Sequence, residues 1–539
     1  MVVTNPILPG FHPDPSILRV GEDFYIANST FEWFGGVEIH HSRNLVDWEF
    51  VTRPLSTREH LDMKGNPASG GIWAPCLSHA DGRFWLIFTD VKSWNDGPFK
   101  DCHNYVTTAT DIRGPWSAPV YLNSSGFDAS LFHDDDGKKW YVNMEWDYRQ
   151  PGVATFSGIL LQRFDPETCL PFGPITKIFR GTPIGLVEGP HLYKREGWYY
   201  LVTAEGGTEY GHAVTVARSR FLAGPYEVHP SNPLMTSRGG SELALQKAGH
   251  GSWCDTPDGR WFLVFLVGRP LPGRKDCVLG RETALAELVW KDGWPQVKGG
   301  GNHPSETLVL EPPLAKRAQT RPNPVRYRFD DLDFLRDFMT LRTPWDSQTY
   351  SITERPGWLR IRGKESPVST HRQALLARRQ TDFCFTAETL LDFEPTSFQH
   401  LAGLIYRYDE TNQYYLRITW DDRRSKRTLG LMVFDKGVMA LPLGTEEIDV
   451  GSGPIFLRLK VDFARAVFSW SRDGASWQTL VPNLTLVRSL MNTVAWASRV
   501  PLSAWRVRTS KPRSFPPIFP FSPTVRIGKT AVWQSRSTT

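Results

Sequence analysis

Three carboxylates of this sequence, Asp14, Asp128 and Glu188, lie far apart in the chain but in segments of one kind. Each is flanked by small or conformationally restricted residues, and Asp14 stands between Pro13 and Pro15, which limit its backbone to few conformations. Taken singly, such an Asp or Glu is most often a turn residue. Taken together, the three could supply one protonated and one ionised carboxyl, the pair that acid–base cleavage of a glycosidic bond requires.

A repeated strand pattern is the reason for grouping them. A turn containing glycine and an acidic residue, followed by an aromatic strand, recurs five times, and both features are typical of β-hairpins. Taking one aromatic residue from each copy as equivalent, the steps between copies are 60, 56, 59 and 62 residues. The aligned residues are Tyr25, Trp85, Tyr141, Tyr200 and Phe262. Counting back 11 to 13 residues from them gives Asp14, Trp73, Asp128, Glu188 and His250.

Each repeat has room for about four short strands, which is the content of one propeller blade. Five repeats therefore predict an all-β protein that begins with a five-bladed β-propeller over residues 1–300; a β-sandwich with coincidental spacing is the alternative. The first strand of each blade lines the central axis, so the five counted-back positions should converge at the mouth of the channel. Because like charges packed together repel, carboxylates at one level favour a functional role over a structural one.

Aromatic and basic residues could complete a sugar-binding site around these acids. Phe31 and Trp73 could present flat apolar faces to a sugar ring. Arg281 falls 19 residues after Phe262, where a further strand could direct it to the axis. Its guanidinium could bind sugar hydroxyls or hold a carboxylate ionised; a surface ion pair is an equally good interpretation of the sequence.

Three segments carry a family resemblance: residues 5–16, 126–130 and 187–191 resemble the acid-bearing motifs of the family 43 glycoside hydrolases, in particular the two-domain β-xylosidases. The resemblance implies an inverting, exo-acting β-1,4-xylosidase that releases xylose from the non-reducing ends of xylo-oligosaccharides. Two alternatives stay open, an α-L-arabinofuranosidase on the same scaffold and a non-catalytic sugar-binding propeller. The fructosidase-type propellers are disfavoured, because their Trp-Met-Asn-Asp-Pro nucleophile motif is missing.

The same resemblance implies residue roles. Asp14 would be the general base, Glu188 the general acid, and Asp128 the residue that tunes and orients the acid. Phe31, Trp73, His250 and Arg281 lie in stretches that resemble the family's sugar-binding segments. The resemblance implies no required cofactor. Some members hold a calcium ion in the channel near a histidine equivalent to His250, but the sequence has no calcium-loop spacing, so we predict no metal ligands and leave Ca²⁺ open.

A second domain is expected after the propeller. Residues 301–327 form a proline-rich linker, and residues 328–485 contain alternating strand patterns that predict a β-sandwich. This part resembles the family's C-terminal domain, which lends a Phe to close the sugar pocket. Residues 486–539 contain no Asp or Glu, and we expect them to form an atypical basic, poorly ordered tail. The pocket-closing Phe is therefore not assigned.

Length and composition restrict the other function classes. A chain of 539 residues needs more than one core. Its net charge is +5, but nine Lys or Arg and no acid follow Asp473, so residues 1–473 carry −4 and offer no basic face to nucleic acid. Its apolar runs are too short to span a membrane. Residues 1–16 do not resemble a signal peptide, and the six cysteines form no C-x-x-C pair, which together predict a cytoplasmic protein. A homo-oligomer is left open.

Overall fold

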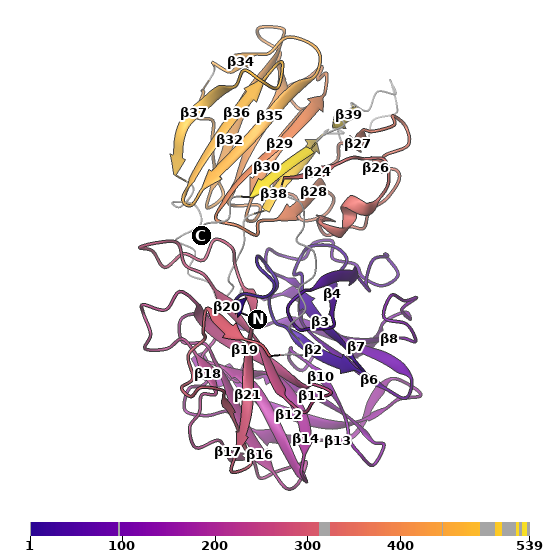
Figure 1. Ribbon diagram of the computed structural model, residues 1–539. Coiled ribbons are helices and arrows are strands. Elements are labelled where there is room, and N and C mark those ends of the chain that lie inside the picture. Colours follow the sequence, from indigo (N-terminus) through magenta and orange to yellow (C-terminus); the bar gives the residue numbers. More distant parts are fainter. Residues whose placement is uncertain are drawn as a thin grey trace. The chain divides into compact units, whose positions relative to one another are not determined.

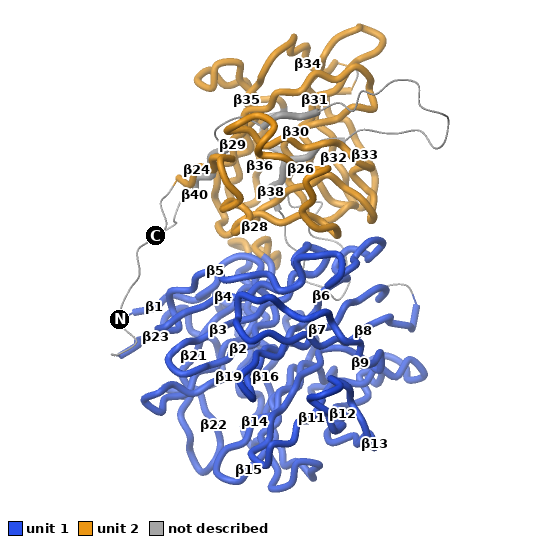
Figure 2. The backbone as a smooth tube through the Cα atoms, turned by 90° about the vertical axis from the view of Figure 1, so that its right-hand side faces the viewer, with its two compact units in different colours: residues 1–270, 280–318, 495–498 blue, residues 271–279, 319–494, 499–539 orange. Residues whose placement is uncertain are grey.

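The computed structural model describes residues 2–94, 97–311, 324–444 and 446–485, and the backbone of three strands beyond them, 502–508, 524–527 and 531–535. This part of the chain is all-β apart from two short 3₁₀ helices, η1 (Gly152–Thr155) and η2 (Asp333–Arg336). It forms two compact units (Figure 2): the first lies within residues 1–270 and 280–318, and the second within 271–279, 319–494 and 499–539. In the ranges described, no helix is both long and apolar enough to cross a membrane.

Five antiparallel sheets of the first unit are each built on four consecutive strands, and the five-bladed propeller is confirmed (Figure 1). The fourth sheet has one additional short strand, β18 (Met235–Thr236), paired with its third strand. The blades in chain order are β2 (Ser16–Val20), β3 (Asp23–Ser29), β4 (Val37–Ser42), β5 (Glu49–Thr52); β6 (Gly71–Ala80), β7 (Arg83–Ser93), β8 (Asp101–Ala109), β9 (Val120–Asn123); β10 (Ser130–His133), β11 (Lys139–Trp146), β12 (Phe156–Asp165), β13 (Leu170–Phe179); β14 (Glu188–Arg195), β15 (Trp198–Glu205), β16 (Ala213–Ser219), β17 (Glu227–Val228); and β19 (Gln246–Asp255), β20 (Trp261–Gly268), β21 (Glu282–Lys291), β22 (Trp294–Val297).

The first strands of the five blades contact one another in a closed ring, β2–β6–β10–β14–β19–β2. The five aligned aromatic residues all lie in the second strands, as the repeat predicts. The hairpins between first and second strands explain the glycine and acidic residues of the repeat. At Asp81–Gly82 the φ angles are 54° and 72°, and at Glu196–Gly197 they are 51° and 74°. Positive φ at both central residues is the type I′ geometry that fits the twist of the flanking strands.

The N-terminal segment is bound to the last blade. Strand β1 (Val2–Thr4) pairs with β23 (Thr307–Val309), and Leu8 forms an isolated bridge with Thr283. The buried Asn5 side chain donates to the carbonyl of Leu285 at 2.9 Å and accepts from the Leu285 N–H at 2.9 Å. These contacts fix the start of the chain beside β21, immediately before the segment that carries Asp14.

The second unit is a sandwich of two antiparallel sheets, which confirms the predicted fold class. Its interior is apolar, and β35 alternates buried Leu457, Leu459 and Val461 with more exposed Arg458 and Lys460. In sheet order the strands are β26 (Tyr350–Ser351), β27 (Leu359–Arg362), β39 (Thr524–Ile527), β29 (Cys384–Asp392), β35 (Ile455–Asp462), β36 (Arg465–Ser471), β37 (Gln478–Thr485), with β24 (Val325–Tyr327) and β40 (Ala531–Ser535) beside them; and β25 (Phe338–Thr340), β28 (Ala374–Arg379), β38 (Leu502–Arg508), β30 (Leu401–Arg407), β31 (Gln413–Asp421), β32 (Lys426–Asp435), β33 (Val438–Ala440), with β34 (Ile448–Asp449) on β32.

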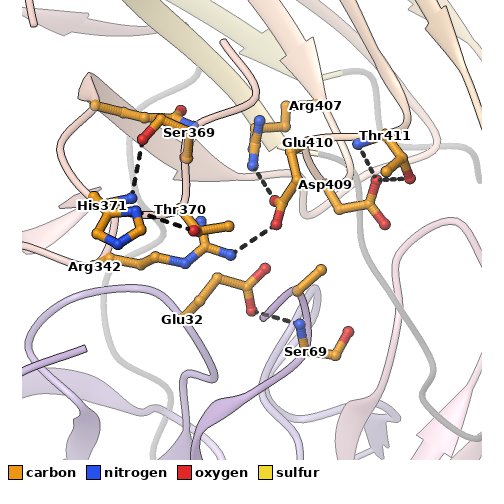
Figure 3. A network of polar contacts seen from close by, with 12 residues as sticks. Glu32, Ser69, Arg342, Ser369, Thr370, His371, Arg407, Asp409, Glu410 and Thr411 are labelled. Atoms are coloured by element: carbon orange, nitrogen blue, oxygen red, sulfur yellow. Dashed lines mark hydrogen bonds and ion pairs between the residues drawn. The ribbon is translucent and has the colours of Figure 1, made fainter. Parts of the chain in front are cut away.

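A buried charge cluster lies within this second unit (Figure 3). Glu410 accepts from Arg342 at 3.0 Å through one carboxylate oxygen and from Arg407 at 2.7 Å through the other. Both arginines are almost completely buried. Two guanidinium groups sharing one carboxylate satisfy a charge that would otherwise be costly to bury.

The domain boundaries differ in detail from the spans expected from the sequence. Residues 271–279, inside the expected propeller span 1–300, group with the second unit and add Leu271, Val278 and Leu279 to its core. Within the expected tail, 486–539, strand β38 pairs with both β28 and β30, while β39 and β40 pair with β29. The rest of that tail lies outside the described residues, so its predicted disorder stays a prediction, as do the exact boundaries.

Candidate active site

The five counted-back positions lie at equivalent places in the five blades. Asp14 and Asp128 each stand two residues before a first strand, β2 and β10. Glu188 begins β14, and Trp73 and His250 lie within β6 and β19. In these last three strands the pairing register shifts at the residue concerned. A β-bulge bends a strand and redirects a side chain, which explains why these strands can direct residues at the axis.

Four candidate residues have left-handed backbone conformations. The φ angles are 53° for Asp14, 55° for Phe31, 53° for Asp128 and 44° for His250. Non-glycine residues rarely adopt such angles, and they persist only where the surroundings hold them. At Asp14 the Asn28 side chain donates to the carbonyl of Pro13 at 2.9 Å. Local backbone geometry thus contributes to the placement of these four side chains.

All seven candidate residues, Asp14, Phe31, Trp73, Asp128, Glu188, His250 and Arg281, line a single cavity of about 570 Å³ in the first unit. The fold therefore brings together residues that are up to 267 positions apart in the sequence. The volume lies in the range of small-molecule sites. Fourteen further residues line the same cavity, among them Trp94, Lys100, Phe127, Trp146 and Phe156.

Asp14 is held by two side chains. Arg281 donates to Oδ1 from Nη1 at 2.8 Å, and the Ser29 hydroxyl donates to Oδ2 at 2.5 Å. Asp14 and Arg281 are only 4% and 5% exposed, so this is a buried ion pair, not the surface pair that the sequence left open. Arg281 Nε is also buried and has no hydrogen-bond partner among the described residues.

Glu188 and Asp128 differ from Asp14 in that burial favours their protonated forms. Burial, reinforced by the charge of Asp14, raises the pKa of Glu188 to about 8, while Arg281 and Lys100 act against this shift. Burial, with the charges of Glu188 and Asp14, also raises the pKa of Asp128 well above its usual value. The two carboxyls interact, so we take the direction for the pair: it retains at least one proton at neutral pH.

Aromatic rings form the wall beside these acids. Phe31 and Trp73 have ring centroids 6.3 Å apart, and the Arg281 guanidinium lies 4.8 Å from the Phe31 ring centre. Trp73 Nε1 donates to the carbonyl of Ser69 at 2.8 Å. The Ser69 N–H in turn donates to buried Glu32 at 3.1 Å (Figure 3). This chain of contacts fixes the orientation of the Trp73 ring.

Four residues of the cavity were not predicted from the sequence: Lys100, Trp94, Phe127 and Trp146. The Lys100 ammonium group lies 4.6 Å from the ring centre of Trp146 and within 6 Å of those of Trp73 and Trp94. It also donates to the carbonyl of Trp94 at 3.2 Å, and burial lowers its pKa. Phe127 could have been found, because it directly precedes Asp128. Lys100 has no local signal, since it precedes a strand without any motif.

The residues around His250 do not fit a calcium ion. Burial lowers the pKa of His250, and its electrostatic neighbours are Asp14, Arg281 and two further imidazoles, His191 and His212. Calcium takes roughly six to eight oxygen ligands. Of the groups that shift the pKa of His250, Asp14 is the one that carries carboxylate oxygens, and both already accept hydrogen bonds from Arg281 and Ser29.

A different group of described residues has the spacing of a metal site. One ligand atom each from His12, Glu38 and His40 lie within 4.8 Å of one another. However, Arg53 donates to Glu38 at 2.6 Å, so the carboxylate that a cation would need is already paired. We derive no chemistry from this group.

The cavity thus combines a proton donor, an anionic acceptor and flat apolar walls. Below pH 8 a protonated Glu188 can give a proton to a ligand oxygen, while Asp14, paired with Arg281, can accept one. The protein therefore has the elements of acid–base chemistry on a neutral, ring-shaped ligand.

The raised pKa of Glu188 predicts a pH-dependent stability difference between the protein and its Glu188→Gln variant. A carboxyl whose folded pKa exceeds its unfolded value contributes stability that is full below about pH 4.5 and is lost as the pH rises to about 8. Relative to Glu188→Gln, the parent should lose up to about 1.4 kcal/mol per pH unit across this window and then level off. Urea unfolding of both proteins at several pH values measures the difference; a constant difference would contradict the assignment.

Comparison with known proteins agrees with this geometry. Residues 3–295 match the family model "Glycosyl hydrolases family 43", and residues 326–496 match "Beta xylosidase C-terminal Concanavalin A-like domain". The chain is 55% identical over 418 residues to "Xylosidase/arabinosidase 43B" of Humicola insolens, covering 77% of this chain and 76% of that one. It is 46% identical over 489 residues to "Beta-xylosidase" of Bacillus subtilis (strain 168), covering 89% and 91%.

A solved structure extends the likeness over both units. The crystal structure of xylan β-1,4-xylosidase from Bacillus halodurans C-125 superposes with a TM-score of 0.92 at 45% identity, over 99% of this chain and 100% of that one. The family model alone spans more than half of the sequence. This chain is therefore a glycoside hydrolase and belongs to glycosyl hydrolase family 43.

Proposed function

We propose that the protein is an inverting, exo-acting β-1,4-xylosidase that releases xylose from the non-reducing ends of xylo-oligosaccharides. The observation that carries the proposal is the contrast between two acids in one cavity: Glu188 with a pKa raised to about 8, and Asp14 in an ion pair with Arg281. Two carboxyls in opposite protonation states are what glycoside hydrolysis needs. The xylosidase names of the B. subtilis and B. halodurans relatives support the choice of sugar.

In this mechanism Glu188 is the general acid and Asp14 the general base. Glu188 gives its proton to the glycosidic oxygen as the bond to the anomeric carbon breaks. A water on the opposite face of the sugar attacks that carbon and transfers a proton to Asp14. Asp128 accepts a hydrogen bond from the Gly189 N–H, next to Glu188, and so is suited to orient the acid and to share its proton.

The other candidates bind the sugar. Phe31 and Trp73 offer apolar faces, and Arg281 Nε offers a buried donor for a hydroxyl. Because burial lowers the pKa of His250, its imidazole is neutral at pH 7 and can both donate and accept a hydrogen bond. A neutral, hydroxyl-rich pentose needs this mixture of partners and no compensating charge.

Inversion predicts the stereochemistry of the first product. Hydrolysis of xylobiose followed by proton NMR from the first seconds should show α-xylose released from the β-linked non-reducing unit before mutarotation. An initial excess of β-xylose over the equilibrium mixture that the reducing unit contributes would replace the general-base role of Asp14 with a nucleophilic one. No release of xylose at all would overturn the proposed substrate.

The acid role of Glu188 predicts a dependence on the leaving group. Glu188→Gln should reduce kcat on xylobiose by roughly 10²- to 10⁴-fold, because the sugar leaving group needs a proton. The loss should be much smaller on a dinitrophenyl xyloside, whose leaving group departs as an anion. Xylobiose binding by calorimetry should persist in the variant. Equal losses on both substrates would assign Glu188 a different role.

An α-L-arabinofuranosidase activity is the second candidate, because the H. insolens relative bears both names. We expect the nitrophenyl β-xyloside to be turned over with the higher kcat/KM and the nitrophenyl α-L-arabinofuranoside as a side activity. Steady-state rates on both pentosides decide the order. Asp14→Asn should abolish both activities if one site performs them; survival of one would show that two sites are involved.

A further inference from the structure

An exposed pair of aromatic rings lies on two segments whose other residues line the cavity. Phe99 and Tyr148 have ring centroids 4.7 Å apart with an interplanar angle of 40°, yet the two residues are 57% and 51% exposed. Neither belongs to the core cluster that contains Trp94 and Phe127. A contiguous apolar surface of this kind in water is typical of a binding site.

The sequence neighbours of the two rings place them at the rim. Phe99 stands between Pro98 and Lys100, which both line the cavity. Tyr148 stands between Trp146 and Gln150, which also line it. Phe99 and Tyr148 themselves do not line the cavity but are exposed on the surface beside the residues that do.

The backbone beneath the rings is held in place. Trp146 Nε1 donates to the carbonyl of Pro98 at 2.9 Å, which joins the two segments. The Asp147 N–H donates to the carbonyl of Thr155 at 2.9 Å, and the Asp147 carboxylate accepts from Arg149 Nε at 2.8 Å. Anchored on both sides of Tyr148, the rings are preorganised, so that little ordering remains to oppose binding.

We propose that Phe99 and Tyr148 form a sugar-binding platform for the xylose unit of a substrate chain that emerges from the cavity on the reducing-end side of the cleaved bond. Xylose units carry no hydroxymethyl group and present flat C–H faces, which suit an exposed aromatic surface. An uncharged ligand also agrees with the position, because Arg149 and Asp147 beside the rings are paired with each other. The protein would then favour xylo-oligosaccharides long enough to reach the rim over xylobiose.

This inference rests on the proposed xylosidase function, and the test separates the two. The Phe99→Ala/Tyr148→Ala double variant is compared with the parent on xylobiose to xylohexaose. We expect kcat/KM on xylobiose to change by less than about 2-fold and kcat/KM on the longer chains to fall by about 3- to 10-fold. An equal loss at every length, or no loss at any length, would overturn the platform.

Two controls complete the design. Phe221→Ala removes a ring that is 70% exposed but does not line the cavity. This variant should have the kcat/KM of the parent on every chain length. Xylohexaose binding to Glu188→Gln, with and without the two rings, is measured by calorimetry. Weaker binding without the rings supports the platform even where turnover is absent, and unchanged binding overturns it. Failure of the parent to cleave xylobiose would count against the proposed function alone.

Discussion

The main constraint on the propeller is the burial of three carboxyl groups, those of Asp14, Asp128 and Glu188, in one cavity. Isolated buried charges are very unfavourable, so a protein must either pair such groups or keep them protonated. This chain does both: Arg281 and Ser29 hold Asp14, whereas burial raises the pKa values of Glu188 and Asp128 so that this pair keeps at least one proton at neutral pH. The two acids thus differ in their surroundings because only Asp14 forms an ion pair with the Arg281 guanidinium.

The geometry that produces this division is a ring of first strands. A closed ring brings residues from five blades to one level, and bulges in β6, β14 and β19 redirect individual side chains within it. Left-handed backbone angles redirect the side chains of Asp14 and Asp128, which lie two residues before β2 and β10. Irregular backbone also occurs elsewhere in the propeller, for example at the Asp81 and Glu196 hairpins and between β8 and β9, but at the axis it coincides with the residues that line the cavity. A stable scaffold can maintain a small number of unfavourable conformations where chemistry needs them.

Much of this was readable in the sequence because it repeats. Aromatic strands at near-constant steps predicted the blades, and an offset of 11 to 13 residues predicted five of the seven candidate residues that line the cavity. The other two, Phe31 and Arg281, were chosen for their side-chain chemistry and the family resemblance. Lys100 and Trp146 escaped prediction because they enter the site through loop and strand-end geometry that no repeat records. Arg281 was found, but its buried pairing with Asp14 depends on closure of the ring and has no local signature. The grouping of residues 271–279 with the second unit was missed for a similar reason: a segment inside one repeat can pack with a distant core.

The attachment of the N-terminal segment to the last blade has a consequence for biosynthesis. Asn5 and Leu8 are held by residues of β21, and Asp14 receives its cation from position 281. On the ribosome, the first acid of the site is made long before the residues that hold it. A nascent chain that ends before the fifth blade cannot yet assemble the ion pair, however well its first four blades have formed. The Asp14–Arg281 ion pair can therefore form only after the chain has been synthesised as far as the fifth blade.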